Sequence, residues 1–195
     1  MNLMLGRPIR ATHAADGFDR MAFTIDDIER MTQAGVLDED DRFELIEGEI
    51  VWGEPKLFAH EWIKLALNRA LSRALPDHPQ LGVETSAYLS PTTVVDPDLS
   101  IFPMMNKREV RGPDLLLAIE VADTSLGKDL HLKARVYAKY GVRELWVIDA
   151  NTRVTHVFRD PVEGEWTHRE SLPADRTLAH VAAPGFAMVL RDLGG

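Results

Sequence analysis

The sequence predicts a fold of the α/β (α+β) class, with a mixed β-sheet core flanked by helices. The segment 60–75 repeats apolar residues at helical spacing, which indicates an amphipathic helix. The segments 114–122 and 144–150 are nearly continuous apolar runs, as expected of strands buried on both faces. A second helical segment, 128–140, joins these two runs. A strand–helix–strand unit of this kind implies a parallel pair of strands with a right-handed crossover.

The size and composition of the chain are those of one soluble globular domain. Its 195 residues fall in the usual domain range, and 45% of them are hydrophobic and 27% charged. We expect residues 1–20 to form a poorly ordered N-terminal arm and residues 21–195 to form the domain. No segment approaches the ~20 apolar residues of a membrane span, and no signal peptide is apparent. We therefore expect a cytoplasmic protein without membrane contact.

The absence of cysteine and the net charge restrict the chemistry. Without cysteine, disulfides and thiolate metal sites are excluded, so any metal must be held by carboxylates, histidines, carbonyls or water. The formal net charge of −9 argues against a broad nucleic-acid-binding surface, because phosphate contacts supply most of that affinity. A small site remains compatible with this charge, because a bound cation reverses the local field.

The first elements of the chain are a helix and a hairpin. The helix begins at Thr24, whose side chain can cap the free amides, and Gly35 ends it. The segment 42–52 places two short apolar runs on either side of Glu47-Gly48, which predicts a β-hairpin with the glycine at positive φ. In the long helix that follows, we expect Trp62 on the apolar face, and Pro76 stops the helix.

The rest of the chain has β character on either side of the helix at 128–140. Three strands are predicted before that helix, at 81–89, 94–102 and 114–122. After the strand at 144–150, shorter strands finish the chain at 153–160, 165–171 and 187–193.

Two acidic residues stand where a strand would prefer none. Asp98 interrupts an apolar strand directly after Pro97, which removes one ladder donor and suggests an edge, bend or bulge. Glu120 ends the apolar run at 114–122. Because an unpaired buried charge is costly, each carboxylate must have a partner. For Glu120 the partner is a shared cation, or else an Arg or Lys, unless the strand end is simply solvated.

The helix at 128–140 supplies a third polar group. Asp129, Lys133 and Tyr137 are spaced four residues apart and therefore line one stripe of it. In one interpretation Asp129 and Lys133 form a salt bridge on a solvated face. In the other, the helix lies back against the strand ends, and Lys133 reaches the pocket of Asp98 and Glu120.

These three residue types make chemical sense together. Two carboxylates bind a hard divalent cation such as Mg²⁺ through oxygen ligands. Such an ion polarises a phosphoryl oxygen and lowers the pKa of a bound water, and a nearby lysine can position that water and stabilise developing charge. Asp98, Glu120 and Lys133 are therefore candidates for phosphodiester hydrolysis.

An ordered set of motifs covers most of the chain, from about Phe23 to the end. In chain order these are RFELIEGE at 42–49, His60, Pro97-Asp98, the stretch from Glu120 to Asp149 with Lys128, Asp129, Lys133 and Tyr137 inside it, and Pro184-Gly185. With this set, the sequence resembles the Uma-type putative restriction endonucleases, a bacterial group within the PD-(D/E)XK nuclease superfamily.

The resemblance implies a restriction-endonuclease-like core that binds Mg²⁺ (or Mn²⁺) and cuts DNA. Asp98 matches the Asp of the PD half, and Glu120 matches the acidic residue of the second half, so both are expected as metal ligands and catalytic residues. The usual lysine of the superfamily lies two residues after that acid. Here that position is Ala122, and the resemblance points to Lys133 as the catalytic lysine instead. Nucleases that cut both strands often act as dimers, so a homodimer is expected by analogy.

Five further residues are candidates for supporting roles: Glu44, Glu47, His60, Asp129 and Tyr137. Glu44 and Glu47 either supply or orient a metal ligand, or they are simply charged residues of a hairpin. His60 either takes part in the site or is an ordinary residue near a helix N-terminus.

Three hypotheses about function stay open on the sequence. The first is a Mg²⁺-dependent endonuclease acting on DNA. The second is a catalytically inactive nuclease-fold protein that acts as a binding or assembly module, which the acidic charge favours. In the third, Asp98, Glu120 and Lys133 form a buried ion network that holds no metal.

Overall fold

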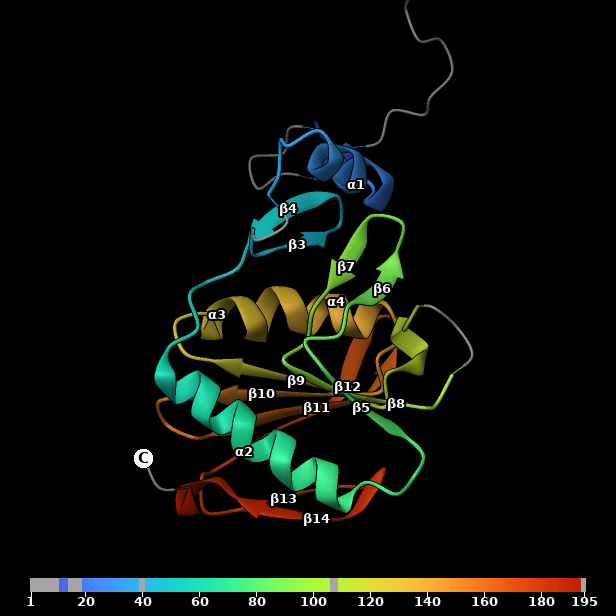
Figure 1. Cartoon of the computed structure of the whole chain (residues 1–195). Helices are drawn as coiled ribbons and strands as arrows, with labels where there is room; N and C mark the ends of the chain where they lie inside the picture. The colour runs from blue at the N-terminus through green and yellow to red at the C-terminus, as the bar shows by residue number, and fades with distance from the viewer. Residues whose placement is uncertain (1–10, 14–18, 39–40, 106–108, 194–195) are drawn as a thin grey trace, which may run out of the picture. The chain divides into compact units, whose positions relative to one another are not determined.

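A computed structural model describes residues 11–13, 19–38, 41–105 and 109–193 of the chain (Figure 1). Most of the predicted N-terminal arm lies outside these residues. Within it, β1 (Ala11–His13) pairs antiparallel with β2 (Asp19–Met21).

The chain divides into two compact units. The smaller unit comprises Met1–Gly53 and Leu89–Val95, and the larger unit comprises Glu54–Tyr88 and Asp96–Gly195. The expectation of one domain over residues 21–195 stays a prediction.

In the smaller unit, helix α1 (Ile25–Gln33) begins at the predicted residue. Thr24 is its N-cap, because Thr24 Oγ1 accepts a hydrogen bond from Asp27 N at 3.2 Å. In return, Asp27 Oδ2 accepts one from Thr24 N at 2.9 Å. This reciprocal capping box satisfies two amides that have no partner inside the helix.

The predicted hairpin is also present in the smaller unit, as β3 (Phe43–Ile46) and β4 (Glu49–Trp52). Its turn residues, Glu47 and Gly48, have φ of 51° and 87°. Two positive φ values in succession are typical of the type I′ turn. Positive φ was predicted for Gly48 alone, but Glu47 adopts it as well. The hairpin belongs to a four-stranded sheet of order β4-β3-β7-β6, with β7 (Thr93–Val95) and β6 (Ala87–Ser90).

The larger unit is built around a six-stranded mixed sheet of order β12-β11-β10-β9-β8-β5. Its strands are β5 (Gln80–Val83), β8 (Leu99–Phe102), β9 (Leu117–Ala122), β10 (Glu144–Asp149), β11 (Thr155–Val162) and β12 (Glu165–Leu172). The central pair, β9 and β10, is parallel, and the other described neighbours are antiparallel. The predicted strand–helix–strand unit is therefore confirmed.

Three of the predicted strands are wrong in their extent. The strand predicted at 187–193 is Ala183–Val189, followed by a 3₁₀ helix at Leu190–Asp192. The runs 81–89 and 94–102 are each divided between two strands, β5 with β6 and β7 with β8, and each pair is split between the two sheets. Glu84 follows β5 with a φ of +46°, which breaks the extended backbone. Pro97, which cannot donate to a ladder, lies between β7 and β8.

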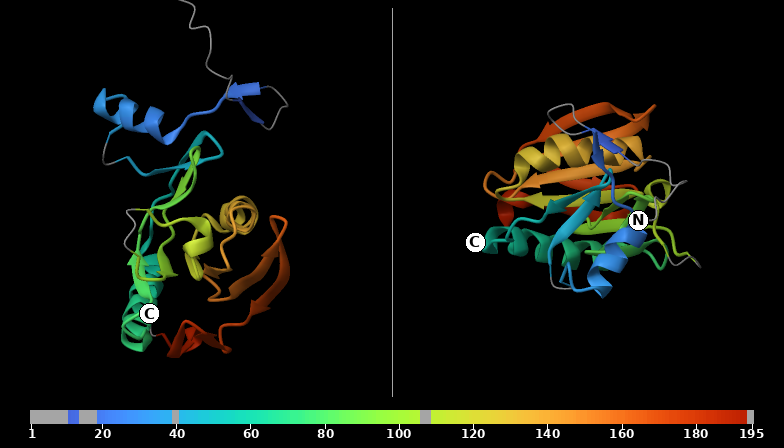
Figure 2. Two further views of the ribbon diagram at one scale, coloured as in Figure 1. Left: turned by 90° about the vertical axis from the view of Figure 1, so that its right-hand side faces the viewer. Right: turned by 90° about the horizontal axis from the view of Figure 1, so that it is seen from above.

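Both faces of the six-stranded sheet are covered. Figure 1 shows α2 (Phe58–Ala74) and the hairpin of β13 (Thr177–His180) and β14 (Ala183–Val189) on one face. A continuous helical segment lies on the other: α3 (Leu126–Lys128), a π-helical turn (Asp129–Lys133) and α4 (Ala134–Lys139). In Figure 2, α4 is seen end-on beside β11 and β12, against which it packs. Short 3₁₀ helices lie at Gly112–Asp114 and Leu190–Asp192.

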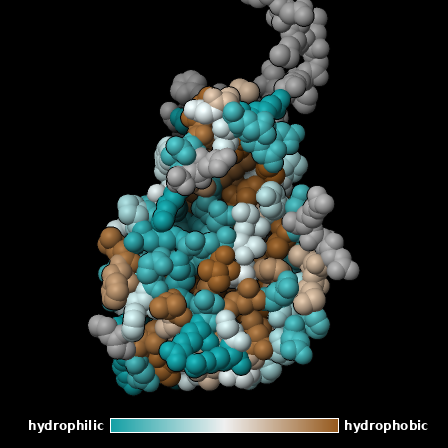
Figure 3. Space-filling model, viewed as in Figure 1, coloured by the Kyte–Doolittle hydropathy of each residue, from teal (hydrophilic) through white to brown (hydrophobic). Residues whose placement is uncertain are grey.

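The main core lies between α2, the sheet and β14. Helix α2 contributes Ile63, Leu67 and Leu71, which pack among apolar side chains of β8, β9 and β10. Trp62, predicted on this face, is instead 39% exposed, because the buried stripe repeats at positions 63, 67 and 71. Figure 3 shows that exposed apolar side chains are scattered among polar ones on the surface. Among the described helices, none has the length and apolar character needed to cross a membrane.

Candidate active site

Asp98 and Glu120 come from adjacent positions on neighbouring antiparallel strands. Leu99 of β8 lies opposite Ile119 of β9, Asp98 directly precedes Leu99, and Glu120 directly follows Ile119. The Asp98 carboxylate accepts a hydrogen bond from Val121 N, with 2.8 Å between Oδ2 and N. The Asp98 carboxylate therefore binds the amide of the residue that directly follows Glu120. Both are buried, with 3% and 4% of their surface exposed.

Asp98 is held from the side of α2. His60, in the first turn of that helix, donates from Nε2 to Asp98 Oδ2 at 3.0 Å. Lys56, which precedes the helix, donates from Nζ to Asp98 Oδ1 at 2.9 Å. Burial alone raises the pKa of Asp98, but the hydrogen bonds and charges of His60 and Lys56 outweigh it and hold that pKa well below its ordinary value. Asp98 is therefore ionised at neutral pH.

Glu120 is held from the other face of the sheet, by the helical segment after β9. Lys133 Nζ lies 2.6 Å from Glu120 Oε1, and Tyr137 Oη donates to the same oxygen at 2.5 Å. Lys133 ends the π-helical turn and Tyr137 lies one turn later in α4, so both side chains come from one stripe.

The solvated-face interpretation of this stripe is wrong. Asp129, Lys133 and Tyr137 are all buried, with exposed fractions of 3%, 4% and 0%. Asp129 accepts a hydrogen bond from Ser125 Oγ at 2.6 Å, across the start of the helical segment. The structure thus brings Lys133 and Tyr137 to Glu120. The pocket that Lys133 would share with both Glu120 and Asp98 stays a prediction.

Sequence reasoning missed two residues of this cluster, Lys56 and Glu84. Glu84 Oε1 accepts hydrogen bonds from Lys56 Nζ at 2.5 Å and from Lys64 Nζ at 2.8 Å. These two bonds lower the pKa of Glu84 from 4.5 to about 2. Lys56 stands in the connecting segment before α2, and Glu84 follows an edge strand, so neither interrupts an apolar pattern. No local signal in the sequence distinguishes them from surface charges.

The other predicted residues have separate outcomes. His60 is 4% exposed and binds Asp98 directly, so it is more than an ordinary N-terminal residue of its helix. Glu44 and Glu47 belong to the smaller unit, Glu44 in β3 opposite Val51 and Glu47 in the hairpin turn. The supporting role predicted for these two residues stays a prediction.

The candidate donors are two carboxylates, which are the ligand type that a hard cation prefers. Asp98 and Glu120 offer carboxylate oxygens, which Mg²⁺ prefers, and Mg²⁺ usually takes only one or two carboxylates and keeps several waters. Within the described parts of the chain, no three or more His, Asp or Glu side chains converge as a metal cage. Two carboxylates completed by solvent therefore fit Mg²⁺ better than an ion that needs an all-protein cage.

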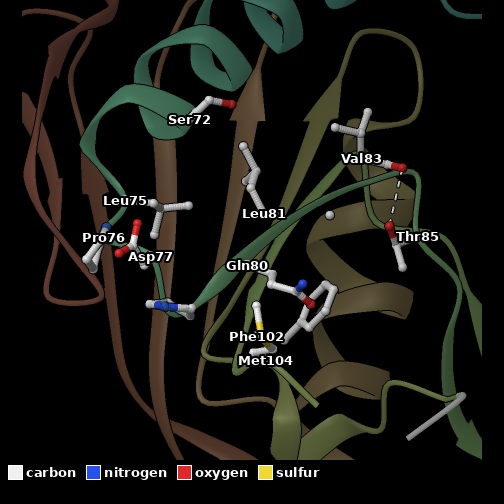
Figure 4. A pocket seen from close by; sticks show the side chains of 12 residues that line it. Ser72, Leu75, Pro76, Asp77, Gln80, Leu81, Val83, Thr85, Phe102 and Met104 are labelled. Atoms are coloured by element: carbon white, nitrogen blue, oxygen red, sulfur yellow. Dashed lines mark hydrogen bonds between the residues drawn. The ribbon is translucent and has the colours of Figure 1, made fainter. Parts of the chain in front are cut away.

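A separate cavity of about 590 Å³ lies beside the edge strand β5 (Figure 4). Its walls come from the end of α2, from β5, and from Phe102 and Met104. Neither Asp98 nor Glu120 lines it, so it is not part of the cluster described above.

Comparisons with known proteins agree with this architecture. A crystal structure of a putative nuclease belonging to DUF820, from Anabaena variabilis, superposes with a TM-score of 0.70 at 17% sequence identity. The match covers 88% of this chain and 97% of that chain. A search among curated proteins finds no match. The family model described as "Uma2: Putative restriction endonuclease" matches residues 25–191. The chain therefore belongs to the Uma2 family of putative restriction endonucleases, as the sequence motifs indicated.

Proposed function

We propose that this chain is a Mg²⁺-dependent endonuclease that hydrolyses phosphodiester bonds of DNA at Asp98, Glu120 and Lys133. One observation carries the proposal: two buried acidic residues stand directly beside the paired residues Leu99 and Ile119 of β8 and β9, and a buried lysine contacts one of them at 2.6 Å. Membership of a family described as restriction endonucleases supports DNA as the substrate.

Asp98 and Glu120 are the residues that would hold the ion. When bound, Mg²⁺ supplies a Lewis acid for a phosphoryl oxygen and a water of lowered pKa. His60 keeps Asp98 ionised and oriented, which makes it a positioning residue. Tyr137 does the same for Glu120 through its hydroxyl group.

Lys133 supplies a fixed positive charge beside Glu120. Its ammonium group is preorganised by burial and by its contact with Glu120. A cation fixed in a site of low dielectric stabilises negative charge on a pentavalent phosphoryl group more than it would in water. Lys133 can also orient an attacking water through one of its three donors.

The proposal is tested by nicking of supercoiled plasmid DNA with Mg²⁺ or Mn²⁺. We expect wild type to cut and Asp98→Asn and Glu120→Gln to lose at least about a hundredfold in rate, as when one electrostatic group is removed from an active site. Asp175→Asn, at an exposed aspartate, is the matched control and should cut like wild type. Equal cutting by Asp98→Asn would show that Asp98 is misassigned. No cutting by wild type with either ion would overturn the proposed activity.

The net charge of −9 favours a second candidate function, a binding or assembly module that keeps the fold without cleaving. Calorimetric titration of Mg²⁺ separates the two in part. Heat that disappears in Glu120→Gln supports a working metal centre, whereas an inactive module needs no such ion.

The assembly and the compartment are also proposals. We propose a homodimer as the working form, because two copies would supply one site for each strand, and the edge strands β5 and β12 permit pairing. Sedimentation of the chain with and without DNA tests this. A cysteine-free composition fits a reducing compartment such as the cytoplasm.

A further inference from the structure

We propose that Lys56 is the internal counter-ion of Asp98, and that a divalent cation bound at Asp98 displaces its ammonium group onto Glu84. The inference rests on the proposed function in one respect, since it takes the cation to bind at Asp98. It adds a residue and a movement that neither the family nor the sequence motifs indicated.

The first step is the position of the ammonium group between two carboxylates. Lys56 Nζ lies 2.9 Å from Asp98 Oδ1 and 2.5 Å from Glu84 Oε1. The Asp98 side chain is only 5% exposed, so its charge would be costly without a partner. In the absence of a metal, the lysine supplies that partner.

The charge of the Lys56 ammonium group supports this role. It lies within ion-pair distance of the carboxylates of both Asp98 and Glu84. A divalent cation on the same carboxylate would repel it at short range.

The second step is that Lys56 has somewhere to go. Its side chain is 26% exposed and that of Glu84 is 47% exposed, so a movement toward Glu84 is a movement toward solvent. Glu84 is anchored independently by Lys64 Nζ at 2.8 Å. Because its four-carbon side chain is flexible, Lys56 can keep its own bond to Glu84 while it leaves Asp98.

Lys133 is the contrasting case. Its side chain is 5% exposed, and its ammonium group contacts Glu120, which is equally buried at 6%. A movement of Lys133 away from Glu120 would leave both charges inside the protein. We therefore assign Lys133 as the lysine that stays in the site and Lys56 as the one that leaves it.

The test is calorimetric titration of Mn²⁺ into the metal-free full-length chain. Lys56→Met should bind Mn²⁺ about tenfold more tightly than wild type, because the competing ammonium is gone. Lys64→Met is the matched control, since it also loses a bond to Glu84 but none to Asp98. We expect its affinity within about twofold of wild type.

Two further variants, Glu84→Gln alone and Glu84→Gln combined with Lys56→Met, distinguish the proposed displacement from a loss of folding. Glu84→Gln removes the group that receives the ammonium, so it should weaken Mn²⁺ binding in the wild-type background but not in Lys56→Met. Without metal, Lys56→Met should melt at a lower temperature than wild type, and saturating Mn²⁺ should raise its melting temperature by more than it raises that of wild type.

The outcomes separate this inference from the proposed function. Equal or weaker Mn²⁺ binding by Lys56→Met, or the same gain in Lys64→Met, overturns the inference. Mn²⁺ binding that Asp98→Asn leaves unchanged, or no binding by any variant, also overturns it and removes the proposed metal site. The expected affinities together with no cleavage of DNA support the inference and defeat only the proposed nuclease activity.

Discussion

At the scale of single residues, each acidic residue of the site has a lysine within hydrogen-bonding distance. Asp98 contacts Lys56 at 2.9 Å, and Glu120 contacts Lys133 at 2.6 Å. A buried carboxylate costs several kcal/mol unless it is paired, so these lysines make the metal-free chain stable. A third interpretation of the sequence, a buried ion network without metal, would use the same contacts. Stability measurements with and without metal distinguish the two.

The first prediction concerns Lys133. Lys133→Met leaves Glu120 buried without its cation and should lower the free energy of unfolding by about 3 kcal/mol, and Tyr137→Phe should lower it by about 1.5 kcal/mol. Lys139→Met, at an exposed lysine of the same helix, should change it by less than about 0.5 kcal/mol. Urea unfolding measures all three. Equal values for Lys133→Met and Lys139→Met would contradict the buried pair.

Melting temperatures measured with and without Mg²⁺ separate a metal site from an ion network. If Asp98 and Glu120 share a cation, added Mg²⁺ should raise the melting temperature of wild type but not that of Asp98→Asn. A pure ion network predicts no shift in either protein.

The second prediction concerns acid stability. The pKa of Asp98 is lowered from 3.8, and that of Glu84 is lowered from 4.5 to about 2. Both groups bind protons more weakly in the folded chain, so their stabilisation is present above the unfolded pKa values and is lost as pH falls through the folded ones. Urea unfolding between about pH 5 and pH 2 should show this loss, and it should be smaller in Glu84→Gln than in wild type. A Glu165→Gln control, at a side chain 75% exposed, should follow wild type.

At the scale of elements, local patterns were sufficient wherever an element is defined by its own residues. The Thr24 cap, the Glu47-Gly48 turn and the strand–helix–strand unit around Lys133 were all predictable from spacing and composition. The breaks in the runs 81–89 and 94–102 were not predicted, because the predicted strands run through the short polar segments 84–86 and 96–98. A positive φ at Glu84 leaves no mark in composition. Which sheet each half joins is decided by partners distant in the sequence.

The third prediction tests the packing of the edge strand β5. A Cβ at Gly82 would lie 2.6 Å from Ser100 Oγ, 2.7 Å from Thr85 Oγ1 and 2.8 Å from Phe102 Cε1. Gly82→Ala should therefore lower the free energy of unfolding by about 1–3 kcal/mol, as overpacking does. Gly127→Ala is the matched change, because its Cβ would meet nothing within 4 Å. It should raise the free energy of unfolding by about 0.5–1 kcal/mol. Thermal or urea unfolding with the same sign for both would contradict the packing at Gly82.

At the scale of the whole molecule, the candidate site is assembled from three distant segments: the start of α2, the β8–β9 pair and the helix after β9. Asp98 and Glu120 could be predicted because each places a charge in an apolar strand. Lys133 could be predicted from the family resemblance and from the helix that returns over the sheet. Lys56 and Glu84 could not, because only the folded chain brings them to Asp98. A prediction based on the strand residues alone therefore omits Lys56, the more exposed of the two lysines in the site.

The last prediction follows from the charge of the whole chain. With a net charge of −9 and with Lys56 and Lys133 engaged by carboxylates, we expect the chain to make few phosphate contacts with DNA. Contacts with about two or three phosphates predict that affinity falls only about 10- to 40-fold between 50 mM and 200 mM salt. The reason is that each contact changes log K by about 0.9 for each tenfold change in salt concentration. A protein with six to ten phosphate contacts would lose about 10³–10⁵. Fluorescence anisotropy with labelled duplex and the Glu120→Gln variant, which should not cut, measures the slope. A steep slope would show that a second copy or another basic surface supplies the missing contacts, and a slope of zero would show that phosphates are not bound at all.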